Sequence, residues 1–325
     1  MKRRVVLSVL LLLLVGGGLG GFLLLRALSA SGGGRGYVRI DQPTPRREVL
    51  NDLEQRGFIR SAAAADLVAR LAGRPATVIA GTYRGNGKRG AWSNVLGLTH
   101  PIVQMLRLPE TNWAKRTANV LQKAEVCLAD DYLKEVNHPR GRKTGFPLPG
   151  TSLEGYLYPD TYDLPPLLGA KAVVGRQLQA FRTKVWEPLN HPADLERILK
   201  VASLVQLEAG RDDERPIIAG VIENRLKKGM KLQIDASILY GLGKWRRLTF
   251  RDYREVDSPY NLYLHSGLPP TPICSPSIAS IRAAMSPARH NYLYYVALPS
   301  GRSLFAATYE EHKRNIEKRK EALKR

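Results

Sequence analysis

Cysteine is nearly absent from this sequence of 325 residues, which contains only Cys127 and Cys274. A disulfide-rich scaffold is therefore excluded. The two cysteines could form one bridge outside the cytoplasm. Both lie among fairly apolar residues, however, and two unpaired buried thiols fit this setting at least as well. The sequence leaves both states open.

Histidine is also sparse, and no metal-ligand spacing is found among His100, His138, His191, His265, His290 and His312. No segment of about 20–50 residues repeats. We therefore predict that the protein holds no metal ion and no cofactor.

Acidic residues are few beside the basic ones: 29 against 50, for a net charge of +21. Such an excess is typical of proteins that meet a polyanion, which can be nucleic acid, an anionic membrane surface or an acidic polymer. A generally basic soluble surface has the same composition, so charge alone does not choose. Hydrophobic residues make up 44%, as in ordinary globular proteins, and the length allows two domains or one large one.

One long uncharged run, residues 5–25, follows the basic cluster at residues 2–4. At about 1.5 Å per residue it spans a hydrocarbon core of about 30 Å, whereas the apolar part of a signal peptide has about 7–15 residues. We predict a single-pass anchor in the cytoplasmic membrane, with cleavage near residues 27–30 as the alternative. The basic cluster stays in the cytoplasm, so the chain after Arg26 lies outside it. Nucleic acid is then not an expected partner, whereas anionic lipid and wall polymer are.

The rest of the chain divides by composition, and the predicted fold class is α+β. Residues 138–149, rich in Pro, Gly, Lys and Arg, are expected to connect two subdomains. The expected parts are a cytoplasmic N-terminus at 1–4, the anchor at 5–25, a Ser/Gly-rich tether at 26–36, a small α+β module with connecting helices at 37–148, and a larger α+β domain at 149–325.

Periodicity and turn residues predict the elements of both domains. In the first we expect strands at 37–40 and 79–83 and helices at 47–56, 61–71, 113–126 and 132–136. In the second we expect helices at 170–186, 198–209, 277–285 and 310–325, and a hairpin of strands 292–296 and 303–306. A further helix ends at Gly229, with Asp212 or Asp213 as its N-cap.

A single carboxylate lies on the apolar face of the helix predicted at 198–209. Glu208 follows Leu204 by four residues, which places both on one face, whereas Gln206 points elsewhere. Gly210 is expected to end the helix. Such a carboxylate is either a paired structural charge or an acid with a raised pKa.

At these residues the sequence resembles the YceG-like, or MltG-type, endolytic murein transglycosylases. The resemblance extends over about residues 37–315 and is specific between 150 and 310. The segments that carry it are LVQLEA at 204–209, ERP at 214–216, VIENRL at 221–226, GMKLQID at 229–235, YG at 240–241, SPYNLY at 258–263, GLPPTPI at 267–273, YLYYVA at 292–297, and upstream EGYLYPDTY at 154–162 and IAGTY at 79–83.

The resemblance implies a fold with an N-terminal transmembrane helix, a LysM-like module and a YceG-like catalytic domain. It implies an enzyme that cuts peptidoglycan glycan strands internally, between N-acetylmuramic acid and N-acetylglucosamine, and leaves 1,6-anhydromuramic ends. The family's catalytic glutamate corresponds to Glu208. Work beside peptidoglycan synthases, where cleavage terminates nascent strands, is also implied. The family often has Glu-x-Glu where this chain has Gln206-Leu207-Glu208, which puts the charge and pKa of the site in question.

A lytic transglycosylase needs only one protein acid, because the muramyl C6 hydroxyl replaces water as nucleophile. Glu208 would donate a proton to the leaving oxygen and then accept the hydroxyl proton, so it must start protonated. The candidate substrate-binding residues are amides that could bond acetamido and hydroxyl groups (Asn224, Gln233, Asn261), rings that could stack on sugars (Tyr158, Tyr260) and carboxylates that could orient the site (Glu154, Glu214, Asp235). Each has a structural alternative, a bond that closes a loop or a helix end.

Two other functions remain open. If Asp235 lies close to Glu208, the pair could act as a muramidase-type hydrolase with two carboxylates. A non-catalytic, membrane-anchored scaffold that binds the cell wall would explain the module and the basic charge, but not Glu208 together with the Gln233/Asp235 loop.

Overall fold

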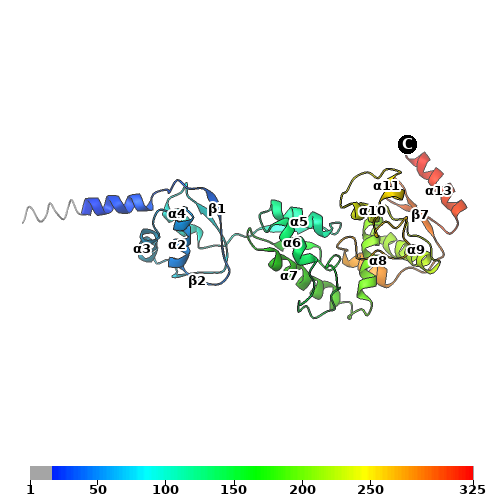
Figure 1. The fold of residues 1–325 in the computed structure, drawn as a ribbon, viewed down its shortest axis with the longest axis horizontal. Coiled ribbons are helices and arrows are strands. Elements are labelled where there is room, and N and C mark those ends of the chain that lie inside the picture. Colours follow the sequence, from blue (N-terminus) through cyan, green and yellow to red (C-terminus); the bar gives the residue numbers. More distant parts are fainter. Residues whose placement is uncertain (1–16, 325) are drawn as a thin grey trace, which may run out of the picture. The chain divides into compact units, whose positions relative to one another are not determined.

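The computed structural model describes residues 17–324 and shows a mixed α+β fold, as predicted. The described chain divides into two units (Figure 1). The first holds the described residues up to Met105 together with Asp163–Leu168, and the second holds Leu106–Tyr162 and the chain from Gly169 onward. The structural division therefore falls at residues 105–106 and not at the expected 148–149. The physical reason is that α6 (Ala129–Val136) packs with both α5 (Ala114–Lys123) and α7 (Ala170–Phe181), so the loop at 138–149 lies within the second unit.

The segment expected as a membrane anchor, residues 5–25, lies partly outside the described residues. Residues 17–28 are helical and largely exposed. Within the described part of the chain, no helix is both long and apolar enough to cross a membrane.

A two-stranded antiparallel sheet organises the first unit, with Val38 opposite Tyr83 in its register. Both side chains are buried together with Leu50 and Leu53 of the first helix after β1. The elements are β1 (Arg35–Ile40) paired with β4 (Gly81–Asn86), β2 (Thr44–Pro45) paired with β3 (Thr77–Val78), α2 (Arg46–Gln55), α3 (Ala62–Leu71) and α4 (Ala91–Gly97). The expected strand at 37–40 and helices at 47–56 and 61–71 are confirmed, whereas the strand expected at 79–83 begins at Gly81.

Two polar interactions position the helices of this unit. Ser61 accepts a hydrogen bond from the backbone N–H of Ala64 and so caps α3, as predicted. Arg46 and Asp66 form a buried ion pair at 2.9 Å. Removing one partner of such a pair typically costs about 3–5 kcal/mol, because the other charge stays buried alone.

The second unit begins with three helices and a short sheet. These are β5 (Met105–Leu108) paired with β6 (Asp160–Asp163), α5 (Ala114–Lys123), α6 (Ala129–Val136) and α7 (Ala170–Phe181), which continues into a π-helical turn, Arg182–Trp186. A cluster of Phe146, Tyr156, Phe181 and Trp186 rings packs beneath them. Both cysteines are free thiols; Cys274 is buried and Cys127 is half-buried.

The remaining elements of the second unit, from α8 to α13, are grouped together in Figure 1. They are α8 (Leu195–Glu208), a 3-10 turn (Asp212–Glu214), α9 (Arg215–Lys227), α10 (Asp235–Leu242), α11 (Asp252–Glu255), α12 (Ile278–Met285), β7 (Tyr294–Ala297), β8 (Ser303–Ala306) and α13 (Tyr309–Ala322). Helices α9, α10 and α12 all contact α8, and α13 lies against β7 and β8. The predicted hairpin is confirmed, with Tyr295 opposite Phe305.

Two expectations about helix ends are wrong. Asp212 and Asp213 do not cap α9; they lie in the 3-10 turn and pair with Arg215 and Arg211. Helix α8 ends because Ala209 turns to an extended conformation, with φ −76° and ψ 115°, so Gly210 is not a left-handed cap. A glycine fits there for another reason, since a Cβ atom would lie 2.9 Å from the carbonyl oxygen of Gly301.

Candidate active site

Glu208 is the last residue of α8, where the buried helix reaches an accessible surface. Leu199, Leu204 and Val205 of this helix are fully buried, whereas Glu208 is half-buried. Burial of a leucine side chain contributes about 1.5–3 kcal/mol, so the apolar turns hold the helix end firmly. The carboxylate therefore stands on a rigid element and remains accessible to a large substrate.

Tyr295 of β7 is the hydrogen-bond partner of Glu208. Its hydroxyl group donates to Oε2 of Glu208 at 2.8 Å. The pairing of β7 with β8 sets the direction of the tyrosine side chain, because successive side chains of a strand point to opposite faces. The bond orients one carboxyl oxygen.

The pKa of Glu208 is raised to about 7 by its surroundings. Burial is the largest cause, and the negative charge of Asp235 acts in the same direction. The hydrogen bond from Tyr295 and the positive charge of Arg225 lower the pKa. Both protonation states of Glu208 are accessible near neutral pH.

Arg225 brings a buried positive charge to the site. Its side chain is 9% exposed, and its guanidinium group donates to the carbonyl oxygens of Leu293 at 2.6 Å and Leu232 at 2.7 Å. The same group lies over the ring of Tyr294, 5.3 Å from its centre. Burial lowers the pKa of Arg225. Because these partners are neutral carbonyl groups, they do not cancel the positive charge of Arg225, which lowers the pKa of Glu208.

Asp235, the first residue of α10, is the second carboxylate of the site. It is exposed and accepts hydrogen bonds from the hydroxyl groups of Tyr263, at 2.7 Å, and Tyr253, at 3.2 Å. Its negative charge raises the pKa of Glu208 and also that of Tyr263, after the effect of burial in both cases. The structure thus brings Glu208 and Asp235 into one electrostatic environment.

Three other candidates stay at least partly exposed. Gln233 is exposed and has a left-handed backbone with φ 54°, fixed by a bond from its N–H to the carbonyl of Leu262. Tyr260 shares a hydrogen bond of 2.9 Å with the hydroxyl of Thr271. Tyr158 lies beneath the ammonium group of Lys184, 5.6 Å from the centre of its ring. These three remain candidates for substrate contact.

Glu154 is not exposed to a substrate, and its expected role as a substrate-binding residue is corrected. The residue is 2% exposed, and its Oε2 accepts from the N–H of Ala114 at 2.9 Å and from the hydroxyl of Tyr240 at 3.3 Å. It thereby joins the start of α5 to α10. Its Oε1 is buried without a hydrogen-bond partner, and burial raises the pKa of Glu154 to about 7.

Three more expected binding residues form hydrogen bonds with nearby loops. Asn261 is fully buried and donates to the carbonyl of Val256. Glu214 is 6% exposed and accepts from the N–H and hydroxyl of Ser303, at 2.7 and 2.8 Å. Asn224 donates to the carbonyl oxygens of residues 290 and 292, at 2.8 and 3.0 Å. It is half-buried and lines an open pocket, so it stays a candidate for substrate contact. Each of these side chains forms hydrogen bonds with backbone groups, as in the structural alternative stated for the candidate residues.

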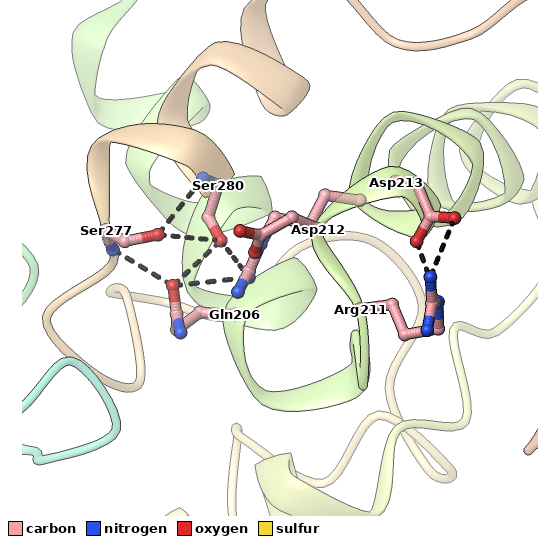
Figure 2. A network of polar contacts seen from close by, with 7 residues as sticks. Gln206, Arg211, Asp212, Asp213, Ser277 and Ser280 are labelled. Carbon is pink, nitrogen blue, oxygen red and sulfur yellow. Dashed lines mark hydrogen bonds and ion pairs between the residues drawn. The ribbon is translucent and has the colours of Figure 1, made fainter. Parts of the chain in front are cut away.

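Gln206 belongs to a separate polar network at the start of α12 (Figure 2). Its Oε1 accepts from the N–H of Ser277 at 3.0 Å, from the hydroxyl of Ser280 at 2.8 Å and from Arg215 at 3.4 Å. Arg215 is also paired with Asp212 at 2.7 Å. Gln206 therefore joins α8 to α12, and Glu208 takes no part in these bonds.

Sequence reasoning missed Tyr295, Arg225, Tyr263 and Tyr253. The three tyrosines lie in segments that contain several tyrosines. The local sequence does not show which of them faces a carboxylate. A signal was present for Arg225, since it lies three residues after Ile222, which is buried, on the same side of the helix.

Comparison with known proteins shows which family this chain is similar to. The model of the YceG-like family matches residues 38–318. An endolytic murein transglycosylase of Bacillus subtilis (strain 168) is 35% identical over 197 residues, 58% of this chain and 50% of the relative. An endolytic murein transglycosylase of Streptococcus pneumoniae (strain D39) is 33% identical over 175 residues, 50% of this chain and 32% of the relative. The matched region thus spans half or less of these curated relatives.

A solved structure has a similar fold. The crystal structure of a yceG-like protein from Listeria monocytogenes is 26% identical, with a TM-score of 0.57. The similarity covers 86% of this chain and 98% of that chain.

Proposed function

The chain belongs to the YceG-like family, and we propose that it is a peptidoglycan lytic transglycosylase. It cleaves the bond between N-acetylmuramic acid and N-acetylglucosamine inside glycan strands and leaves 1,6-anhydromuramic ends. The observation that carries the proposal is Glu208: an accessible carboxyl group on a rigid helix end, with its pKa raised to about 7. The relatives named endolytic murein transglycosylases support the substrate class.

The reaction requires one proton donor that later becomes a proton acceptor. Protonated Glu208 donates to the glycosidic oxygen, and the bond from that oxygen to the muramyl C1 breaks. The carboxylate then accepts the proton of the C6 hydroxyl as that oxygen forms a bond to C1. One bond breaks, one forms, a proton moves between the two oxygens through Glu208, and water is not consumed. An acid with its pKa near the working pH suits both steps.

The neighbours of Glu208 balance its two states. Burial and Asp235 favour the neutral acid needed at the start, whereas Tyr295 and Arg225 favour the carboxylate formed after proton transfer. The hydrogen bond from Tyr295 also keeps Oε2 in place while its charge changes.

A two-carboxylate hydrolase is the second candidate, because Asp235 interacts electrostatically with Glu208. In that reaction Asp235 acts as the nucleophile or activates water, and the product has a reducing end. The two hydroxyl groups that donate to Asp235 hold it as an oriented acceptor.

Mass spectrometry of digested glycan strands distinguishes the candidates. Anhydro ends support the lytic transglycosylase, reducing ends support the hydrolase, and intact strands support a non-catalytic wall-binding scaffold. Glu208→Gln is expected to abolish cleavage while the protein stays folded. Glu196→Gln is the matched control, since Glu196 lies on the same helix in an exposed pair with Lys200. Near-normal turnover of Glu208→Gln would overturn the assignment.

We also propose the placement that the sequence predicts: a single-pass N-terminal anchor, a LysM-like module after it, and the catalytic unit outside the cytoplasm, where cleavage beside peptidoglycan synthases terminates nascent strands. The uncharged run at 5–25 behind a basic cluster supports the anchor. A chain that lacks residues 1–26 is then expected in the soluble fraction, and the full chain in the membrane fraction at high salt. Release of the full chain by salt alone contradicts the anchor.

A further inference from the structure

An open groove of about 530 Å³ lies beside α10, and all of its lining residues except Asp235 lie outside the expected set of binding residues. Its lining includes Asp235, Leu239, Arg247, Phe250 and Tyr253. The loop between α10 and α11 supplies Arg247 and Phe250. We call it the Phe250 groove.

The Phe250 groove shares Asp235 with the candidate active site. Asp235 lines it and raises the pKa of Glu208, and Tyr253 lines it and donates to Asp235. When a polymer is cleaved in its interior, several sugar units lie on each side of the reacting bond. The enzyme therefore needs binding surface on both sides of that bond. Because it shares Asp235 with the site, the Phe250 groove is a candidate to hold some of these sugar units.

Phe250 is 88% exposed, an unusual position for a phenylalanine. Its ring contributes little to the core and is available for contact with a ligand in the groove. Sugar rings present C–H faces that stack on aromatic rings and hydroxyl groups that bond to carboxylates. The groove offers both partners, since it places Phe250 and Tyr253 near Asp235.

Arg247 supplies a charge without a partner among the described residues. The neighbouring Arg246 is held by Asp252 through two bonds of 2.7 Å, whereas the side chain of Arg247 is exposed and has no such bond in the described structure. A free guanidinium group in a saccharide groove matches a carboxylate on the polymer. Muramyl units of peptidoglycan carry peptides with free carboxylates.

We propose that the Phe250 groove is a subsite for peptide-bearing glycan, next to the subsites at the cleaved bond. Phe250 stacks on a sugar ring, and Arg247 binds a carboxylate of the attached peptide. This inference rests on the proposed function. It gives the peptide carboxylate as the feature by which the enzyme selects long, peptide-bearing strands.

The test compares single variants of the full chain on three substrates: long strands with peptides, long strands with the peptides removed, and a short oligosaccharide. Phe250→Ala is expected to raise KM about tenfold on both long substrates, with kcat and the short substrate unchanged. Arg247→Ala is expected to raise KM about fivefold on peptide-bearing strands alone.

Two matched controls separate a local contact from general effects. Arg251→Ala removes the same charge from the same loop but not from the groove lining, and Leu128→Ala removes an exposed apolar side chain, 64% exposed, elsewhere in the unit. Both are expected to leave every KM unchanged. The subsite is overturned if Phe250→Ala behaves like Leu128→Ala, or if Arg247→Ala and Arg251→Ala have equal effects.

Binding measured with the inactive Glu208→Gln protein keeps this inference distinct from the proposed function. In that background Phe250→Ala is expected to weaken binding to long strands about tenfold. Failure of Glu208→Gln to stop cleavage overturns the function, whereas unchanged strand binding overturns the subsite. Loss of binding to phosphatidylglycerol vesicles but not to strands would also overturn it, in favour of a lipid contact.

Discussion

The hydroxyl group of Tyr295 donates a hydrogen bond of 2.8 Å to Oε2 of Glu208, across 87 positions in the sequence. This bond opposes the rise in pKa that burial causes. The pKa of Glu208 is therefore set by two opposing effects. Burial favours the neutral acid that starts the reaction, and the hydroxyl group of Tyr295 favours the carboxylate that forms later.

Tyr295→Phe removes that bond and is expected to raise the pKa of Glu208. The alkaline limb of the kcat profile then moves to higher pH, by about one pH unit, because Glu208 stays protonated longer. The maximal rate falls about tenfold, since the carboxylate formed in the reaction loses a charge-assisted bond. Rates measured on purified strands between pH 5 and pH 9 check this (about two pH units on each side of the raised pKa). Tyr292→Phe, on the same segment, is the control and leaves the profile in place.

Asp235→Asn removes the negative charge that raises the pKa of Glu208. The alkaline limb is expected to move to lower pH, opposite to the shift in Tyr295→Phe, and cleavage with anhydro ends continues. In a two-carboxylate hydrolase the same change removes a reacting group, and turnover falls by about a thousandfold or more. Asp213→Asn makes the same charge change at an exposed position and is expected to have neither effect.

Gln206 is expected to matter for stability and not for proton transfer. Gln206→Glu keeps an oxygen for Ser277, Ser280 and Arg215, so kcat stays within about twofold and the melting temperature does not fall. Gln206→Met leaves those donors without an acceptor and lowers the free energy of unfolding by about 1–3 kcal/mol. Thermal unfolding and strand cleavage measured on both variants check the two parts. A large loss of kcat in Gln206→Glu would contradict the separation of Gln206 from Glu208.

Glu154 is expected to make the protein less stable as the pH rises. Its folded pKa of about 7 lies above the value of 4.5 for a free side chain, so the folded state binds the extra proton between these values. Stability is fully present below the unfolded pKa and decreases as the pH rises through the folded pKa, by about 2 kcal/mol. Chemical unfolding at pH 5 and pH 8, about two units below and one above that pKa, checks this. The difference is expected to be smaller in Glu154→Gln, and an equal difference in both proteins contradicts the role of Glu154.

Local sequence signals predicted many elements because their causes are local. The Ser61 cap depends on residues within one turn, and the 294–297 and 303–306 strands are joined by a short turn with Gly301. Helix α10 was not predicted, because its eight residues form a nearly continuous apolar run without helical periodicity. The capping aspartates were misplaced because Asp212 and Asp213 have arginine partners that compete with the helix end.

Among the candidate binding residues, exposure could not be read from the sequence. Glu154 and Asn261 were both candidate substrate-binding residues, yet both are buried. A polar residue in a turn either meets solvent or closes the turn, and the local pattern is the same in both cases.

The sequence by itself determined the α+β class, the resemblance to the YceG-like family and the place of Glu208 at the end of a buried helix, because these depend on residue types at short spacing. Only the tertiary structure decided what surrounds that carboxylate. Tyr295, Arg225 and Asp235 come from three different elements, and their effects on the Glu208 pKa act through space. Burial and charge at a point depend on which elements pack there, and no spacing along the chain contains that information.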